Sequence, residues 1–140
     1  MAEFIFKRII SERDPHGNYV IESRATSAEE LGNPVYPPAR RTLMSHGIGC
    51  AGKIAVQLTR LDYGKYDLLV GMDSANIRNM HRLFGSDPEG KIKKLMDYTK
   101  RPGDVDDPWY SGNFELTYRD ILEGCEALFE AIKNEKEIQK

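Results

Sequence analysis

The chain has 140 residues, of which 40% are hydrophobic and 30% charged, a composition typical of a single globular domain. Lys and Arg number 20 against 22 Asp and Glu, and this near-neutral balance excludes a bulk attraction to nucleic acid or to an anionic membrane. No apolar run approaches the roughly 20 residues that a transmembrane helix needs, and the N-terminus carries no basic leader, so we expect a cytoplasmic protein.

The first ten residues predict an amphipathic helix. This helix begins at Met1 without an N-cap, and it brings a protonated amine to the positive end of the helix dipole, which is unfavourable. We therefore expect that the natural start of the fold lies upstream of residue 1. The apolar positions that share one helical face are Ala2, Ile5, Phe6, Ile9 and Ile10.

Short apolar segments then alternate with helical patterns. Residues 19–23 predict a short strand, and residues 32–47 predict a loop that feeds a helix ending at Gly47. The continuous apolar run 66–72 is typical of a strand buried on both faces of a parallel sheet. Residues 73–85 predict a helix with Asp73 as N-cap and Gly85 at its end.

The last third contains a strand candidate at 91–96, a long polar loop at 97–113 and a helix at 114–136. A loop of this length without periodicity is usually functional or disordered. The alternation of helices and short apolar strands predicts an α/β open parallel sheet with helices on both faces, formed by a single domain over 1–140. The apolar stripe of the last helix consists of Tyr118, Ile121, Leu122, Cys125, Leu128, Phe129 and Ile132.

The two cysteines, Cys50 and Cys125, are far apart and belong to no C-x-x-C or Cys/His cluster. We therefore expect neither a disulfide framework nor a metal site, and no cofactor. For Cys125, a buried core thiol is favoured over a reactive one. The histidines, His16, His46 and His81, pair with no nucleophile in the sequence, so solvated surface positions are favoured for them.

The most unusual stretch is D-V-D-D-P-W-Y-S-G-N-F-E at 104–115. Pro108 restricts the residue before it, so Asp107 is expected in an extended conformation, as a carboxylate that must reach a fixed point would be. The neighbouring Asp106 disfavours a second charge and can raise one of the two pKa values toward general-acid use. The alternative is an acidic surface turn with Trp109 and Tyr110 folded onto the core.

The sequence resembles the low-molecular-weight protein tyrosine phosphatases over nearly its whole length. The resemblance rests on E-S-R-A-T-S, G-N-P-V-Y-P-P-A-R, H-G-I, Q-L-T, Y-D-L-L-V-G-M-D-S-A-N-I-R-N-M and above all D-P-W-Y-S-G-N-F-E. It implies a phosphotyrosine phosphatase I-like (flavodoxin-like) fold, in which a four-stranded parallel sheet is flanked by helices.

The resemblance also implies roles for individual residues. Asp107 corresponds to the general acid that protonates the tyrosyl leaving oxygen and then, as a base, activates the water that hydrolyses the phosphocysteine. Trp109 and Tyr110 correspond to the aromatic wall of the substrate cleft. Ser23 resembles a residue that braces the phosphate loop, and Asp106 is a second candidate for loop support.

The nucleophile of this family lies in a C-x5-R-S loop after the first strand, and no such loop occurs in residues 1–140. Six positions after Cys50 stands Val56, and six after Cys125 stands Ala131, so neither cysteine has the arginine. The resemblance therefore implies that the first, central strand and the phosphate loop lie upstream of Met1. We expect residues 19–23 and 66–72 either to close on each other or to be covered in a homo-oligomer.

Two functions follow. The first is a tyrosine phosphatase that acts on a phosphotyrosine protein or an aryl phosphate once the loop is restored, and that is inactive as the chain stands. The second is a non-catalytic pseudophosphatase that acts by association through exposed sheet surfaces.

Overall fold

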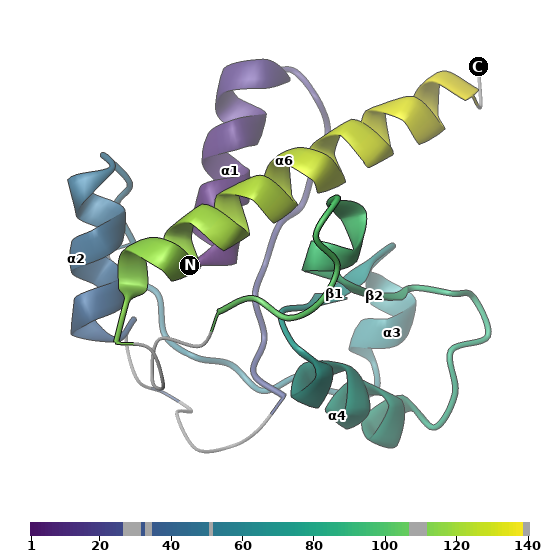
Figure 1. Cartoon of the computed structure of the whole chain (residues 1–140). Helices are drawn as coiled ribbons and strands as arrows, with labels where there is room; N and C mark the ends of the chain where they lie inside the picture. The colour runs from purple at the N-terminus through teal and green to yellow at the C-terminus, as the bar shows by residue number, and fades with distance from the viewer. Residues whose placement is uncertain (27–31, 33–34, 51, 107–111, 139–140) are drawn as a thin grey trace.

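A computed structural model describes residues 1–26, 32, 35–50, 52–106 and 112–138. Helices dominate the chain, and the longest of them, at its C-terminal end, runs across the whole molecule (Figure 1). In chain order the elements are α1 (Ala2–Arg13), α2 (Pro37–Ser45), α3 (Asp62–Lys65), β1 (Leu69–Gly71), α4 (Ser74–Phe84), β2 (Ile92–Lys94), the 3-10 helix η1 (Leu95–Tyr98) and α6 (Phe114–Ile138).

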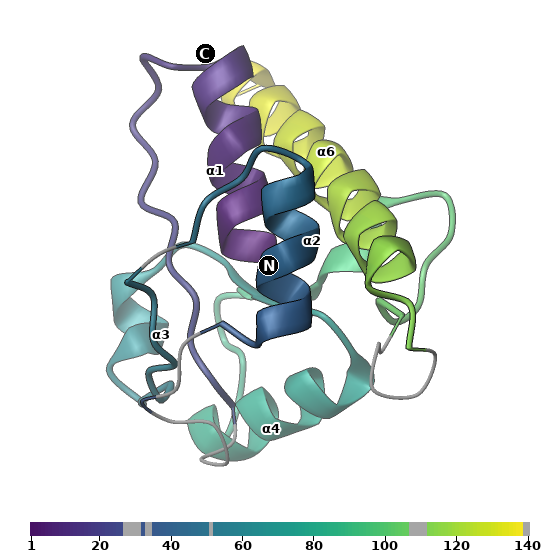
Figure 2. The same ribbon diagram turned by 90° about the vertical axis from the view of Figure 1, so that its left-hand side faces the viewer.

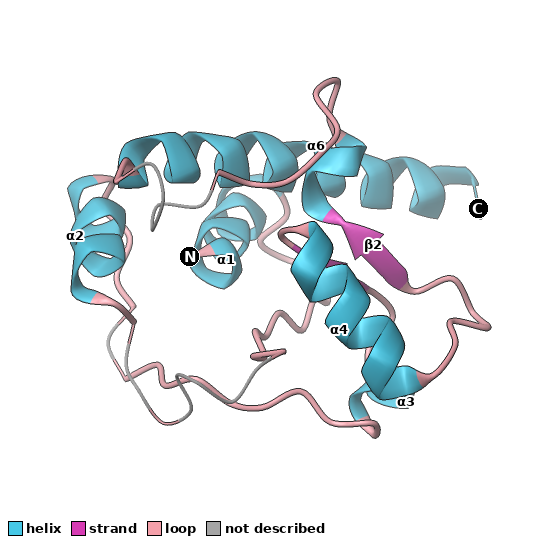
Figure 3. Cartoon of the chain, turned by 60° about the horizontal axis from the view of Figure 1, so that its bottom comes forward, coloured by secondary structure: helices cyan, strands magenta, loops and turns pink. Residues whose placement is uncertain are grey.

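The helices form two layers around the short strands. Helices α1, α2 and α6 pack together on one side, and α3 and α4 lie on the other (Figure 2). Helix α6 contacts α1, α2 and η1, whereas α4 contacts both strands. Figure 3 shows α4 running alongside β2. The α/β class, with helices on both faces, is confirmed.

The sheet of the described residues is parallel and two-stranded, and the register places Leu69 opposite Ile92 and Gly71 opposite Lys94. The strands predicted at 66–72 and 91–96 are therefore present but shorter than their apolar runs. A parallel strand extends only as far as its neighbour offers backbone groups to pair with. Within the described segments β1 pairs with β2 alone.

The strand predicted at residues 19–23 is wrong, since this segment has no strand pairing in the structure. Strand formation depends on a partner strand more than on local propensity. The expected closure of residues 19–23 onto 66–72 is wrong for the same reason. The nearest pairing lies just beyond, at an isolated parallel bridge between Ala25 and Gln57, where the Ala25 N–H donates to Val56 O at 2.7 Å.

Helix α4 confirms the predicted capping residues at both ends. The Asp73 carboxylate accepts a hydrogen bond from the Asn76 N–H at 2.8 Å, which satisfies one of the free donors of the first turn. Gly85 ends the helix with a φ of 79°, a conformation that costs glycine little. These signals are local in sequence, so they could be recognised without knowledge of the tertiary fold.

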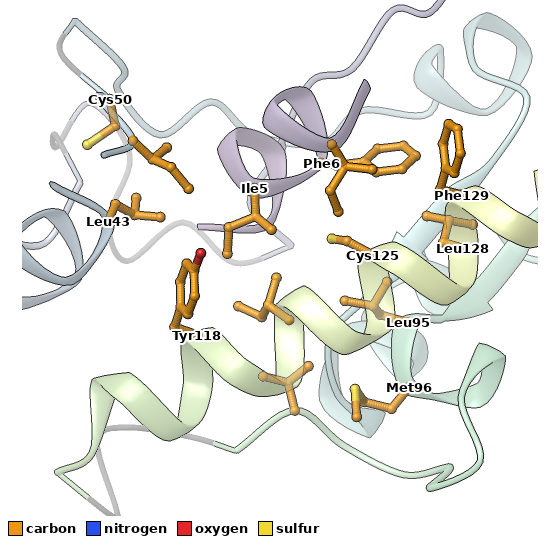
Figure 4. Close-up of a cluster of buried hydrophobic side chains, with 14 residues drawn as sticks. Ile5, Phe6, Leu43, Cys50, Leu95, Met96, Tyr118, Cys125, Leu128 and Phe129 are labelled. Atoms are coloured by element: carbon orange, nitrogen blue, oxygen red, sulfur yellow. The ribbon is translucent and has the colours of Figure 1, made fainter. Parts of the chain in front are cut away.

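The main core lies between α1, α6 and η1 (Figure 4). Helix α6 can approach η1 closely because it carries Gly124 where the two helices cross, and a Cβ there would lie 2.5 Å from Leu95 Cγ. The most deeply buried side chains of this core are Ile5, Leu43, Leu95, Met96 and Cys125.

Among the described residues, no helix combines the length and the apolar character that a membrane crossing requires.

Candidate functional site

The stretch that carries the predicted chemistry is bracketed by two described residues, Asp106 and Gly112. The predicted acid Asp107 and the predicted aromatic wall, Trp109 and Tyr110, lie outside the described residues. The structure does describe how the chain is held immediately before and after them. The contacts of these flanking residues therefore define how the acid stretch is attached to the fold.

The chain is anchored before the acid stretch at the carboxyl end of β1. The Val105 N–H donates to Met72 O at 2.9 Å, and the Val105 side chain is buried in the main core. The Asp104 carboxylate accepts hydrogen bonds from both the N–H and the Oγ of Ser74, each at 3.1 Å, at the first turn of α4. It also lies 3.0 Å from Lys94 Nζ, and this hydrogen bond lowers the pKa of Asp104.

Both backbone groups of Asp106 are held by side chains of α6. The Asp106 N–H donates to Asp120 Oδ2 at 3.0 Å, and the Asp106 carbonyl accepts from Thr117 Oγ1 at 3.0 Å. Thr117 and Asp120 are buried, with exposed fractions of 5% and 6%. The second oxygen of Asp120, Oδ1, lies 3.2 Å from Arg101 Nη2, so the buried carboxylate has an ionic partner.

Helix α6 begins directly after the acid stretch. The Asn113 side chain accepts a hydrogen bond from the Leu116 N–H at 3.0 Å, as an N-cap residue does. The ring of Phe114 lies 6.0 Å from that of Tyr36, next to the first turn of α2. A groove of about 540 Å³ lies between α2 and the start of α6, with Arg41 and Glu115 among its lining residues.

Ser23 lies beside the first turn of α1. Its hydroxyl and its backbone N–H both donate to Glu3 Oε1, at 2.7 and 3.0 Å. Glu3 also pairs with Lys53 at 2.8 Å and with Lys7 at 2.7 Å. Burial alone would raise the pKa of Glu3, but the hydrogen bonds from Lys53, Lys7 and Ser23 outweigh it and lower the pKa to about 2.

Neither cysteine is placed to act as a nucleophile. Cys50 and Cys125 are 5% and 2% exposed, and burial raises the pKa of the Cys125 thiol to about 12. A reactive thiol needs the opposite shift, because the thiolate is the nucleophile. The core position predicted for Cys125 is confirmed.

All three histidines are exposed, as predicted, but His46 also makes specific contacts. The ring of His46 stacks on Tyr118 of α6, with centroids 3.8 Å apart and planes 5° from parallel. Its Nε2 lies 3.0 Å from a carboxylate oxygen of Glu115. His46 therefore joins the end of α2 to the start of α6 while its side chain stays partly exposed.

The family model described as "Low molecular weight phosphotyrosine protein phosphatase" matches residues 1–138. The chain belongs to this phosphatase family. The match includes the predicted acid stretch and every element described above. It confirms the resemblance derived from the D-P-W-Y-S-G-N-F-E stretch.

Individual relatives of the low molecular weight phosphatase family agree with this assignment. The chain is 32% identical over 140 residues to the low molecular weight protein-tyrosine-phosphatase YfkJ of Bacillus subtilis, covering 99% of this chain and 90% of the relative. It is 31% identical over 135 residues to the low molecular weight phosphotyrosine protein phosphatase of Rattus norvegicus, covering 93% and 85%.

Solved phosphatase structures share the arrangement of helices and strands. The crystal structure of YfkJ matches with a TM-score of 0.90 and 32% identity, covering 96% of this chain and 86% of that one. The crystal structure of SP-PTP from Streptococcus pyogenes matches with a TM-score of 0.81 and 34% identity, covering 93% and 81%.

Sequence reasoning missed two residues that the structure places at the acid stretch, Thr117 and Asp120. A signal was available, because both lie on α6 one helical turn apart, beside the apolar stripe that begins at Tyr118. A polar pair next to a buried stripe usually has buried hydrogen-bond partners. The sequence does not show, however, that the partner of this polar pair is the backbone of Asp106.

Proposed function

We propose that this family member provides the acid half of a phosphotyrosine phosphatase, with Asp107 as its general acid and base. The proposal is supported by the family match over residues 1–138, which includes the stretch D-P-W-Y-S-G-N-F-E. It is also supported by the anchoring of Asp106, because an acid must be held within hydrogen-bond reach of the leaving oxygen.

The reaction is a double displacement at phosphorus. A cysteine thiolate in a C-x5-R loop attacks the phosphorus, the bond to the tyrosyl oxygen breaks, and Asp107 gives its proton to that oxygen. Water then attacks the phosphorus of the phosphocysteine and gives a proton back to Asp107. The bond between sulfur and phosphorus breaks, so phosphate and the cysteine thiolate are released. Trp109 and Tyr110 would enclose the aromatic ring of the substrate. Ser23, which binds Glu3 at the start of α1, would support the phosphate loop.

The nucleophile does not come from residues 1–140. No cysteine in the chain is followed by arginine six positions later, and Cys125 is a buried thiol with a raised pKa. Acid catalysis alone contributes about 10² to 10⁴-fold and has no phosphoryl acceptor to assist. We therefore expect the 140-residue chain to be inactive by itself.

The test is hydrolysis of p-nitrophenyl phosphate at mildly acidic pH by the 140-residue chain and by a version extended with a strand and a C-x5-R-S-P segment. Activity in the extended version alone supports the proposal. In that version, Asp107→Ala should lower kcat by about 10² to 10⁴-fold. Activity in the short chain contradicts the account of the nucleophile, and inactivity in both contradicts the proposed function.

A second candidate is a non-catalytic member that acts by association. It is supported by exposed apolar side chains outside the acid stretch, among them Val20 at 74% and Leu61 at 86%. Sedimentation velocity distinguishes it: a concentration-dependent dimer of the 140-residue chain supports association, and a monomer at all concentrations contradicts the homo-oligomer.

A further inference from the structure

We propose that Thr117 and Asp120 are positioning residues of the proposed acid: two buried side chains of α6 that orient the backbone from which Asp107 departs. The inference rests on the proposed function, in which Asp107 is the general acid. Its direct evidence is that Asp120 and Thr117 bind the two polar backbone groups of one residue, Asp106.

These two hydrogen bonds act on two different peptide planes. The Asp106 N–H, bound by Asp120, belongs to the plane that joins Val105 to Asp106. The Asp106 carbonyl, bound by Thr117, belongs to the plane that contains the nitrogen of Asp107. Because a peptide unit is rigid, holding both planes limits φ and ψ of Asp106 and directs the bond that leads to the Cα of Asp107.

The sequence adds a second restriction at the next residue. Asp107 precedes Pro108, and proline disfavours the helical region for the residue before it. The backbone torsions between the fixed peptide of Asp106 and the Asp107 carboxyl group then have a narrower range. The anchor therefore determines where a proton donor can be delivered, which is the property that general acid catalysis requires.

Thr117 also reaches the far side of the acid stretch. Its Oγ1 lies 3.4 Å from the carbonyl oxygen of Asn113, in addition to its 3.0 Å contact with Asp106. One hydroxyl thus lies between the residue before the acid stretch and the residue that caps α6 after it. Its single proton is donated to the nearer oxygen, that of Asp106, and the longer contact places Asn113 next to the same side chain.

Asp120 is suited to its role by charge. One carboxylate oxygen binds the Asp106 N–H while the other pairs with Arg101, so both oxygens have partners in a position that is 6% exposed. A carboxylate binds a backbone N–H more strongly than a neutral acceptor does. Glu123 pairs with Arg101 as well but has no contact with Asp106 in the described structure, which makes it a matched control.

The test uses Trp109, the one tryptophan of the chain, as a reporter two positions beyond Asp107. Acrylamide quenching of its fluorescence is measured in the 140-residue protein. Loss of an anchoring hydrogen bond in Thr117→Val or Asp120→Ala should raise the quenching constant by about twofold, because the backbone that leads to Trp109 is then less restrained. Thr117→Ser, which keeps the hydroxyl, and Glu123→Gln should match the unmodified protein.

Far-UV circular dichroism and urea unfolding establish that each variant is folded. An unchanged quenching constant in folded Thr117→Val and Asp120→Ala overturns the proposal. An equal rise in Glu123→Gln overturns it too, because the effect would then come from Arg101 and not from Asp106. If Asp120→Ala does not fold, the comparison of Thr117→Val with Thr117→Ser decides the question.

A kinetic measurement in the extended protein separates positioning from general stability. Misplacing an acid slows release of a poor leaving group more than a good one. Thr117→Val should therefore lower kcat for phenyl phosphate about tenfold more than for p-nitrophenyl phosphate, with KM unchanged. An equal loss for both substrates overturns the positioning role. An inactive extended parent would contradict the proposed function, and the Trp109 measurement would still decide whether the anchor exists.

Discussion

The Ser23 hydroxyl donates a hydrogen bond to Glu3 Oε1 at 2.7 Å, across 20 residues of sequence. This contact attaches the extended segment after α1 to the first turn of that helix. Glu3 also pairs with Lys53, so three separate segments meet at one buried carboxylate. Ser23 was expected to support a loop from the resemblance alone, and its role in catalysis stays a prediction.

Glu3→Gln should destabilise the protein at neutral pH. The folded pKa of Glu3 is about 2 against an ordinary value of 4.5, so its contribution is fully present above pH 4.5 and is lost as the pH falls through 2. This shift corresponds to at most about 3 kcal/mol of the free energy of unfolding.

Urea unfolding between pH 2 and pH 7 measures the effect of Glu3→Gln. The variant should lose stability at pH 7 and converge with the parent protein near pH 2. Glu12→Gln is the control, since Glu12 forms an exposed pair with Arg8 on the same helix and should change the free energy little. A constant difference between Glu3→Gln and the parent at all pH values would contradict the assignment of the lowered pKa to Glu3.

Asp73→Ala should lower the free energy of unfolding by about 1 kcal/mol, because it removes the side chain that caps α4. Asp73→Asn keeps an oxygen that can accept from the Asn76 N–H and should retain most of the stability. Urea midpoints of the two variants provide the measurement. Equal losses in both would show that the charge of Asp73, and not its cap hydrogen bond, stabilises the helix.

Gly124→Ala should destabilise the fold although it improves helix propensity. The new Cβ would lie 2.5 Å from Leu95 Cγ, and Leu95 is itself buried, so the core must shift at a cost of about 1–3 kcal/mol. The gain in helix propensity is about 1 kcal/mol. Thermal unfolding should therefore give a lower Tm.

Gly64→Ala in α3 is the matched control for Gly124→Ala, since a Cβ at Gly64 meets no described atom within 4 Å. Its Tm should be equal to that of the parent protein or higher. If both variants gain stability, η1 packs less tightly on α6 than the structure indicates.

The thiols should be unreactive in the folded protein. Burial raises the pKa of Cys125 to about 12, and Cys50 is also buried, so a disulfide reagent at pH 8 should label neither until urea is added. A Cys50→Ser variant assigns any residual reaction to Cys125. Rapid labelling of Cys125 under native conditions would be inconsistent with its place in the core.

Elements with local signals were predictable from the sequence. Asp73 and Gly85 mark the ends of α4 within the segment itself, and the stripe from Tyr118 to Ile132 identifies α6 by its period alone. Residues 19–23 carried a strand pattern but form no strand, because pairing is decided by what lies beside the chain and not by the chain itself.

The acid stretch, likewise, was only partly predictable from the sequence. Its composition and the proline after Asp107 could be recognised in the sequence, but the hydrogen bonds to Asp106 come from residues 11 and 14 positions further along. Only the docking of α6 brings Thr117 and Asp120 to that peptide. Contacts of this kind leave no spacing rule in one sequence.

The anchor at Asp106 has a consequence for how this protein can be redesigned or can diverge. Since α6 holds the backbone on one side and Asn113 caps the helix on the other, the intervening residues are attached at both ends by contacts that do not involve them. Loop closure becomes only slowly less favourable with length. A change in the number of residues between these two ends should therefore alter the closure free energy little, whereas one residue inserted between Phe114 and Thr117 would rotate Asn113 and Phe114 by about 100° relative to Thr117 and Asp120, which the packing of α6 holds in place.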